Sequence, residues 1–321
     1  MLTTPLGRMA SSEGYCDPDT SPVLSLLRSQ PMTRICAPMV RYSKQSFRQL
    51  VRLYGVDVAY TPMILADSFT KSAKARNADF STSSTDRPLI VQVASNCSEE
   101  FALAAEMVTP LSDGIDINCG CPQRWAVQEH YGCWMLSQPD LVADMISTAR
   151  RRLPSRFTVS IKIRLKEDLR QTVEFVRRME AAGVSFLTVH GRTQQQRVEP
   201  PNLEAVKLLR ESVNIPVVHN GGINTLQEAE DTWSFTGVAG IMVAQGLLNN
   251  PALFDGHPHT PESCVSKFLD VATKYGTQFS HFQHHVSYMV KDLLPRADRH
   301  QINLLGSTAA IIDFLGDRGI I

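Results

Sequence analysis

The sequence predicts a (β/α)8 barrel followed by a small all-helical C-terminal domain. Eight short apolar runs recur between residues 35 and 246, and longer stretches with helical periodicity separate them. This alternation is typical of repeated strand–helix units, and eight such units close a parallel barrel. A doubly wound open sheet is the alternative, but no GxGxxG motif follows the first run, which favours the barrel.

The predicted strands and helices alternate along this part of the chain. Strands are predicted at residues 35–39, 56–63, 89–94, 114–120, 158–164, 186–191, 216–222 and 240–246. Helices are predicted between them at residues 44–54, 99–108, 139–152, 169–182, 203–212 and 226–234. The segment 66–85 has a weaker pattern and is harder to assign.

After Pro251 the strand pattern stops. Amphipathic stretches at 261–276, 278–294 and 300–316 predict three helices with no strand between them. We therefore expect a flexible leader at 1–30, a catalytic barrel at 31–257 and a helical domain at 258–321. Within the leader, the apolar residues 23–27 are suited to dock as a partial helical turn.

Composition excludes several classes of protein. The 321 residues carry 32 Lys and Arg against 32 Asp and Glu, so a nucleic-acid partner would need a local basic patch. Seven cysteines without a paired pattern indicate a reducing environment, and because no charged region followed by an apolar core is apparent in the first residues, we expect no secretory signal. No apolar run approaches the ~20 residues that cross a membrane. We expect an intracellular monomer, cytoplasmic or nuclear, with no membrane partner.

Polar, Gly or Pro residues interrupt nearly every predicted strand at its end. In a barrel these ends meet at one mouth, where polar groups are costly unless they bind a ligand. The turns "NGG" (220–222) and "AQG" (244–246) have backbone N–H groups suited to a phosphate; the alternative is that they are only tight turns. Alternation in "SIKIR" directs Lys162 and Arg164 into the lumen. There Lys162 and His190 would either hold an electron-rich cofactor ring or be structural.

Two short patterns have the spacing of metal ligands. "GIDINCGCPQRW" (114–125) ends a strand in two cysteines, and spacing alone leaves a metal site, a disulfide, a nucleophile and an acid open. In "HFQHH", His281 and His285 lie one helical turn apart, but no Cys or acidic residue is close in sequence. We expect a solvent-exposed or RNA-facing helix surface there, and no metal site.

Seven motifs carry a resemblance to a known family. "CAPMVRYS", "QVASN", "DINCGCPQRW", "SIKIR", "TVHGRT", "NGGI" and "GIMVAQGLLNNP" follow one another between Ile35 and Pro251. In this order they resemble the tRNA-dihydrouridine synthases, FMN-dependent enzymes that reduce uridine in the D-loop of tRNA. The wording "CGCPQRWA" is most similar to the eukaryotic branch named for positions 20a and 20b. The resemblance extends from Ile35 to the C-terminus, and the combination is specific although each motif alone is weak.

The resemblance implies a cofactor role for residues at most of the strand ends. Beside the FMN ring would lie Pro38, Met39 and Val40, with Gln92 on its pyrimidine edge and Asn118 near both the ring and the uracil. Lys162 and His190 would approach the ring. The FMN phosphate would be held by Asn220, Gly221, Gly222, Ala244 and Gln245. The family usually has Arg at the position of Gln245. Since a charge-assisted hydrogen bond is roughly twice as strong as a neutral one, we expect weaker retention of FMN.

The reaction that the resemblance implies needs a proton donor from the protein. NADPH or NADH reduces FMN, hydride passes from N5 of FMN to C6 of uracil, and a proton is added at C5. The donor must be protonated at neutral pH and reach the base, and a thiol with a pKa of about 8.5 meets both conditions. Cys121, on a loop stiffened by Pro122, is the candidate. Cys119 is expected to pack in the strand.

The resemblance also implies that the partner is tRNA. The helical domain would help to dock it, and Arg164, Arg192, Arg296 and Arg299 are candidates to contact RNA. Two other functions stay open on the sequence. One is an FMN barrel oxidoreductase that acts on a small molecule of the dihydroorotate or enone type, and the other is a catalytically weak tRNA-binding homologue.

Overall fold

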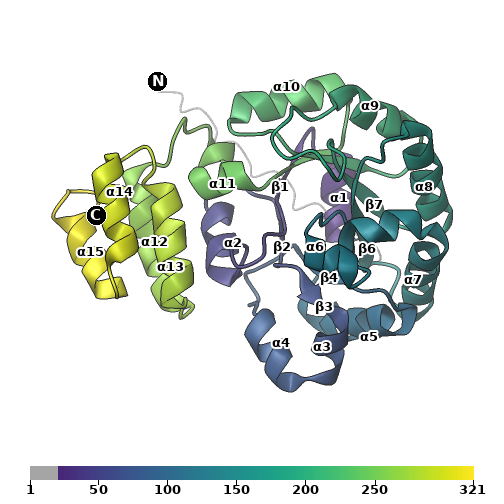
Figure 1. Cartoon of the computed structure of the whole chain (residues 1–321), viewed down its shortest axis with the longest axis horizontal. Helices are drawn as coiled ribbons and strands as arrows, with labels where there is room; N and C mark the ends of the chain where they lie inside the picture. Colours follow the sequence, from purple (N-terminus) through teal and green to yellow (C-terminus); the bar gives the residue numbers. More distant parts are fainter. Residues whose placement is uncertain (1–20) are drawn as a thin grey trace, which may run out of the picture.

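A closed parallel sheet forms the centre of the computed structural model, which describes residues 21–321 (Figure 1). Its strands within the described chain are β1 Thr33–Cys36, β2 Val58–Tyr60, β3 Ile64–Leu65, β4 Leu89–Ala94, β5 Gly114–Cys119, β6 Thr158–Arg164, β7 Phe186–His190, β8 Val217–Asn220 and β9 Gly240–Val243. The order is β2-β1-β9-β8-β7-β6-β5-β4, and β2 pairs with β4 to close the ring. The predicted eight-stranded barrel is confirmed.

The ninth strand, β3, does not add a position to the barrel. β2 pairs with Leu89 and Ile90 at the start of β4, and β3 pairs with Val93 and Ala94 at its end. Pro62 lies between β2 and β3 and has no N–H for the ladder, so the single run predicted at 56–63 is divided in two.

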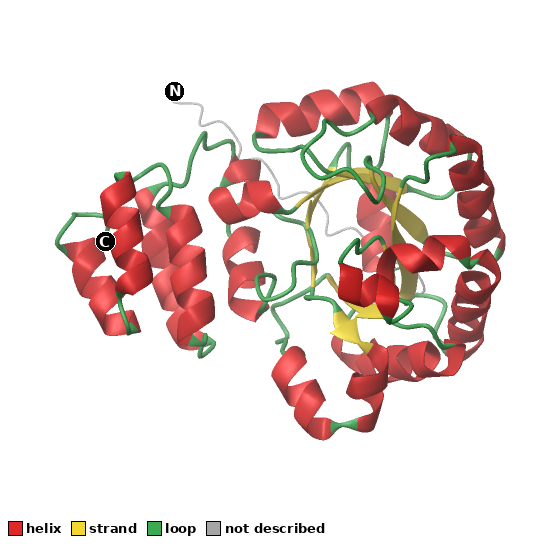
Figure 2. Cartoon of the chain, viewed as in Figure 1, coloured by secondary structure: helices red, strands yellow, loops and turns green. Residues whose placement is uncertain are grey.

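Helices surround the barrel, as Figure 2 shows. They are α2 Gln45–Arg52, α3 Ala66–Lys71, α4 Ala73–Asp79, α5 Ser98–Val108, α6 Arg124–Gln128, α7 Pro139–Arg152, α8 Leu169–Ala181, α9 Leu203–Glu211, α10 Leu226–Thr236 and α11 Gln245–Asn249. The six predicted helices agree with these to within about two residues at each end. The unassigned segment 66–85 contains α3 and α4, and Ser72 ends one and caps the other by accepting a hydrogen bond from Ala75 N–H.

Helix α1, Pro22–Ser29, closes the amino-terminal end of the barrel. Its Val23 and Leu27 are buried in a lumen cluster with Ile35, Ala37, Val58, Tyr60, Ile90, Phe186, Val218 and Met242. Alternate residues of the same strands pack outward against the helices. Part of the expected leader is therefore ordered from residue 22, because its apolar residues fill the lumen. Residues 1–20 lie outside the described chain.

Four helices follow the barrel: α12 Glu262–Lys274, α13 Phe279–Met289, α14 Arg296–Leu304 and α15 Thr308–Gly316. The single helix predicted at 300–316 is wrong, since Leu305–Ser307 separate α14 from α15. Gly306 is a poor helix residue, and the Ser307 side chain accepts a hydrogen bond from Ala310 N–H to begin a new helix.

The helical unit formed by α12–α15 shares its apolar core with the barrel. α12 packs along α2, and one buried cluster contains Phe47 and Leu50 of α2 together with Phe268 and Val286 of the unit. No helix within residues 21–321 is long and apolar enough to span a membrane.

A buried ion pair ties α2 to the segment before β4. Arg48 is 1% exposed and Asp86 0% exposed, and their closest N–O distance is 2.6 Å. The Arg48 guanidinium also donates to the carbonyl oxygens of Ser43 and Ser81, each at 2.7 Å. Arg52 reaches the other oxygen of Asp86 at 3.4 Å. The two arginines and one carboxylate leave one net positive charge, which the carbonyl groups help to solvate.

Asp86→Ala should destabilise the protein strongly, because it leaves Arg48 charged and buried without its partner. Loss of one member of such a pair costs about 3–5 kcal/mol, which urea unfolding would measure. Lys71→Ala is the matched control, since Lys71 pairs with Glu100 at the surface and is 68% exposed. Equal urea midpoints for Asp86→Ala and Lys71→Ala would show that the buried ion pair contributes no more to stability than the surface pair, which would contradict this prediction.

Candidate active site

A hydrogen-bonded chain of lumen side chains lies at the carboxyl ends of β4 and β5. Asp116 is fully buried and accepts from Gln92 Nε2 at 2.8 Å and from Ser160 Oγ at 2.7 Å. Gln92 Oε1 accepts from Asn118 Nδ2 at 2.9 Å. Asn118 Oδ1 in turn accepts from the backbone N–H of Cys121 at 2.9 Å. Two predicted site residues, Gln92 and Asn118, are thus joined to the cysteine loop.

Asp116 was not among the residues that the sequence singled out. The signal was present, since alternation in "GIDIN" places Asp116 on the same face as Asn118. Burial raises the pKa of Asp116 to about 6, while hydrogen bonds from Gln92 and Ser160 and the charge of Lys162 lower it. At neutral pH the group is mainly a carboxylate, which requires donors from its neighbours.

Lys162 faces the lumen beside Asn118, as the alternation predicted. The two residues are in register across β5 and β6. Burial and the nearby Arg164 lower the pKa of Lys162 to about 8, so the amine is still mainly protonated at pH 7. Within residues 21–321 it forms no ion pair. A cation without a partner at this place suits an anionic or electron-rich ligand.

The two cysteines of "NCGC" point to different places. Cys119 is fully buried and packs in the cluster between the strands and the outer helices. Cys121 lies beyond the strand end and is half-buried. Its carbonyl accepts from Cys133 N–H at 3.0 Å, and Gly132, with φ +61, lies so close that a Cβ there would be 2.4 Å from that oxygen. The loop is therefore held at the Cys121 N–H by Asn118 and at the Cys121 carbonyl by Cys133.

The turns after β8 and β9 enclose a cavity of about 270 Å³. It is lined by Asn220, Gly221, Gly222, Ala244 and Gln245, which the sequence assigned to a phosphate, and also by His190 and Arg192.

The glycines of the first turn cannot be replaced without strain. Gly221 has φ +114, and a Cβ there would be 2.8 Å from the His190 ring. Gly222 has φ +76, and a Cβ would be 2.9 Å from Pro201.

Arg192 supplies charge to this cavity. Among the described residues that line it, Arg192 is the one Lys or Arg. Its NH1 lies 3.2 Å from His190 Nε2, and because a guanidinium only donates, the histidine nitrogen accepts. Burial and the charges of Lys162, Arg164 and Arg192 lower the pKa of His190 to about 2. His190 is therefore neutral, and the positive charge near the turn belongs to Arg192.

Pro38, Met39 and Val40 form the turn after β1. Met39 is half-buried, and Val40 is 55% exposed. The turn is closed by hydrogen bonds from Tyr42 N–H and Ser43 N–H to the Met39 carbonyl, both at 3.0 Å. It therefore presents an apolar surface beside the mouth.

The four arginines proposed to contact RNA have different surroundings. Arg164 is 8% exposed and donates to the carbonyl groups of Gly120, Thr193 and Gln196, so its burial leaves little surface for RNA. Arg192 belongs to the cavity described above. Arg296 is exposed and Arg299 half-buried on α14, on the far side of the helical unit from the barrel in Figure 1.

The two histidines of "HFQHH" do not share an exposed surface. His281 is half-buried, but His285 is 1% exposed and packs against the barrel. The expectation of an exposed helix surface is therefore wrong for His285. No group of three His, Cys, Asp or Glu side chains within residues 21–321 is arranged to hold a metal ion.

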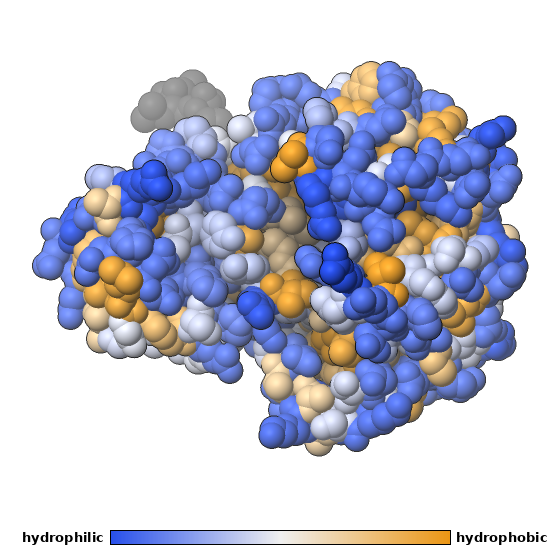
Figure 3. All heavy atoms as spheres, viewed as in Figure 1, coloured by the Kyte–Doolittle hydropathy of each residue, from blue (hydrophilic) through white to orange (hydrophobic). Residues whose placement is uncertain are grey.

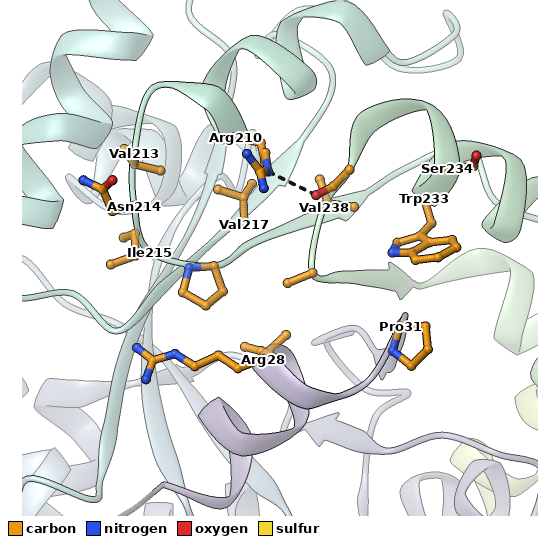
Figure 4. A pocket seen from close by; sticks show the side chains of 14 residues that line it. Arg28, Pro31, Arg210, Val213, Asn214, Ile215, Val217, Trp233, Ser234 and Val238 are labelled. Carbon is orange, nitrogen blue, oxygen red and sulfur yellow. Dashed lines mark hydrogen bonds between the residues drawn. The ribbon is translucent and has the colours of Figure 1, made fainter.

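Figure 3 shows the mouth as a depression between the barrel and the helical unit, with both hydrophilic and hydrophobic residues around its rim. A larger cavity, of about 680 Å³, lies at the opposite end of the barrel and is shown in Figure 4. Arg28 of α1, Arg210 and Trp233 line it, and Arg210 donates to the Gly237 carbonyl at 3.2 Å. None of the candidate site residues reaches it, and active sites of such barrels lie at the carboxyl ends of the strands.

Comparisons with known proteins agree with the motifs. Residues 35–306 match the family described as dihydrouridine synthase (Dus). A Mus musculus protein named tRNA-dihydrouridine(20a/20b) synthase, NAD(P)+-like, is 47% identical over 92% of this chain and 91% of its own length. The tRNA-dihydrouridine(20a/20b) synthase of Schizosaccharomyces pombe is 40% identical over 94% of this chain and 93% of its own length.

A solved structure supports the fold alone. Old yellow enzyme from Trypanosoma cruzi has a TM-score of 0.53 and 10% identity, covering 79% of this chain and 98% of that one. The match of the family over most of the chain and the high identity of the relatives confirm the resemblance that the motifs predicted. This chain belongs to the dihydrouridine synthase family.

Proposed function

We propose that this protein is an FMN-dependent tRNA-dihydrouridine synthase, which reduces the C5=C6 bond of D-loop uridines with NADPH or NADH. The observation that carries the proposal is the hydrogen-bonded chain from Asp116 to the Cys121 loop on β4 and β5, next to Lys162 on β6, with the glycine turns further around the ring after β8 and β9. This arrangement supports a common site for the Cys121 thiol, the Lys162 amine, which has no ion pair within residues 21–321, and the cavity at the glycine turns. The names of the relatives favour uridines 20a and 20b, and a tRNA substrate favours a location in the cytoplasm or nucleus.

The residues at the mouth fit FMN. Gly221 and Gly222 form a tight turn of positive φ, in which added side chains would meet His190 and Pro201, and the cavity of about 270 Å³ beside this turn has Arg192 as its cation. Backbone N–H groups and a guanidinium are the donors that a phosphate prefers. Lys162, without an ion pair in the described chain, would then face the electron-rich ring, with Gln92 and Asn118 beside it.

The protein residues divide the remaining work. When bound and reduced by NAD(P)H, FMN supplies the hydride that uracil C6 accepts. Cys121 Sγ–H then gives a proton to C5, and the thiolate is reprotonated from solvent. Asn118 holds the loop so that Cys121 faces the mouth, and Met39 and Val40 exclude water beside the ring.

The helical unit would hold the body of the tRNA while one uridine turns out of its loop to lie at the mouth. Loop nucleotides cost the least energy to extrude. Exposed Arg296 on α14 is a candidate phosphate contact, and we expect the enzyme to act as a monomer.

The first test of the function is the RNA of cells that lack this protein. Dihydrouridine at positions 20a and 20b should be missing from their tRNA, as read by mass spectrometry or by reverse-transcription mapping, and the wild-type gene should restore it. The purified protein should bind FMN with quenching of flavin fluorescence. A full set of dihydrouridines in the mutant cells, or a protein that binds no flavin, would refute the proposal.

Cys121→Ala should lose dihydrouridine formation by a factor of about 10²–10⁴, the usual contribution of a general acid. NAD(P)H should still bleach the bound flavin, because that half-reaction does not use the thiol. Cys119→Ala is the matched control, since Cys119 is fully buried and faces the outer helices, away from the lumen. Turnover by Cys121→Ala equal to that of Cys119→Ala would eliminate the acid role.

Arg192→Gln should weaken FMN binding and leave riboflavin binding unchanged, because riboflavin has no phosphate. A hydrogen bond to a charged group contributes about 1.5–3 kcal/mol, which is roughly a tenfold to hundredfold change in Kd. Gln245→Arg in the same background should restore part of the affinity by placing a cation at the other turn. Similar losses of affinity for FMN and riboflavin would show that Arg192 does not act through the phosphate.

A further inference from the structure

His285 connects the helical unit to the mouth of the barrel. It lies on α13, is 1% exposed, and its Nε2 is 3.0 Å from the carbonyl oxygen of Tyr42. Tyr42 lies two residues after Val40, at the end of the turn after β1 that contains Met39 and Val40. The contact joins residues 243 positions apart in the sequence.

The chemistry of this contact fixes the state of the ring. A carbonyl oxygen only accepts, so His285 Nε2 must carry the proton and donate. The other nitrogen, Nδ1, has no partner among the described residues and is buried. A second proton there would be an unsatisfied buried charge, and burial accordingly lowers the pKa of His285 to about 3. The residue is a neutral donor at every physiological pH.

Aromatic neighbours hold the His285 ring in place. It stacks on Phe47 of α2 with centroids 4.6 Å apart and planes at 15°. It meets Tyr42 edge-on at 5.6 Å and Phe268 of α12 at 5.3 Å. With the ring fixed on three sides, its donor has one direction, toward the Tyr42 carbonyl.

The turn that receives this hydrogen bond is also held by the buried Ser43 and by Arg48 of α2. Ser43 is fully buried; its Oγ accepts from Met39 N–H at 2.9 Å, and its carbonyl accepts from Arg48. Between Met39 and Tyr42, Arg41 has φ +72, a left-handed conformation that a residue with a side chain adopts at a cost. A turn in this conformation needs support from its surroundings.

We propose that His285 is a positioning residue for the flavin site: it holds the turn that presents Met39 and Val40 to the ring. This inference rests on the proposed FMN site, and it gives the helical unit a second role besides contact with tRNA. The unit adds a hydrogen bond from its own side to a turn that Ser43 and Arg48 hold on the side of the barrel.

Two substitutions separate the hydrogen bond from the packing. His285→Phe keeps an aromatic ring against Phe47 and removes the donor. His285→Gln loses the ring but keeps an amide that can donate to the same carbonyl. Leu315→Ala is the matched control, because Leu315 is fully buried in α15 of the same unit and no hydrogen bond within residues 21–321 joins it to the turn. All are made in the full chain, since the shared core makes removal of the helices uninformative.

The first measurement is hydrogen exchange of the peptide 39–47 in protein without flavin, well below the melting temperature. His285→Phe should speed its exchange roughly tenfold, as expected for loss of one buried hydrogen bond. His285→Gln and Leu315→Ala should leave it close to the wild-type rate, even where they lower the melting temperature.

The second measurement is flavin binding and turnover. His285→Phe should bind FMN and riboflavin about tenfold more weakly. It should also lower kcat with little change in KM for tRNA. His285→Gln should recover both the flavin affinity and kcat. Unchanged exchange and flavin affinity in His285→Phe, or equal changes in Leu315→Ala, would overturn the positioning role. If the wild-type chain binds no flavin, the proposed function fails, while the exchange experiment still decides whether His285 holds the turn.

Discussion

The carboxylate of Asp116 sets the orientation of the polar side chains above it. Because a carboxylate only accepts, Gln92 must turn Nε2 toward it, which leaves Oε1 to face Asn118. Asn118 then has to present Nδ2 to Gln92, and its Oδ1 is free to accept from the Cys121 backbone. One buried charge thus determines the direction of two amides and, through them, the position of the thiol-bearing loop. An Asn at position 116 would leave both amide orientations undetermined.

The positive charge of the mouth is divided among three side chains with separate tasks. Arg164 is used by carbonyl groups of the loops after β5 and β7 and is therefore part of the framework. Lys162 lies in the lumen without an ion pair among residues 21–321, and Arg192 lines the cavity at the glycine turns. Arg192 is itself oriented there, because its Nε donates to the Glu199 carbonyl and its NH1 to the neutral His190. Two cations of the mouth therefore lie at separate places, Lys162 in the lumen and Arg192 at the glycine turns, where Gln245 carries no charge.

Sequence alone predicted the barrel and most of the lumen because both depend on a period of two. Alternation placed Lys162 inside, and apolar runs located eight barrel positions. The end of the strand, rather than alternation, separated Cys119 from Cys121. The same period does not say how deeply a side chain is buried or which group it meets. Arg164 was consequently expected at RNA rather than among carbonyl groups, and the partner of His285 lies 243 residues away. The break at Gly306 was missed because the apolar pattern continues on both sides of it.

Helix α2 explains why the domain boundary in the sequence is not a boundary in the core. It begins immediately after the turn that carries Met39 and Val40, and it packs against α12 of the helical unit. Arg48 holds α2 to the barrel through Asp86, and Phe47 holds it to the helical unit through His285. A displacement of the helical unit would therefore be transmitted through α2 to the turn that carries Met39 and Val40. In this arrangement the helical unit and that turn are mechanically coupled.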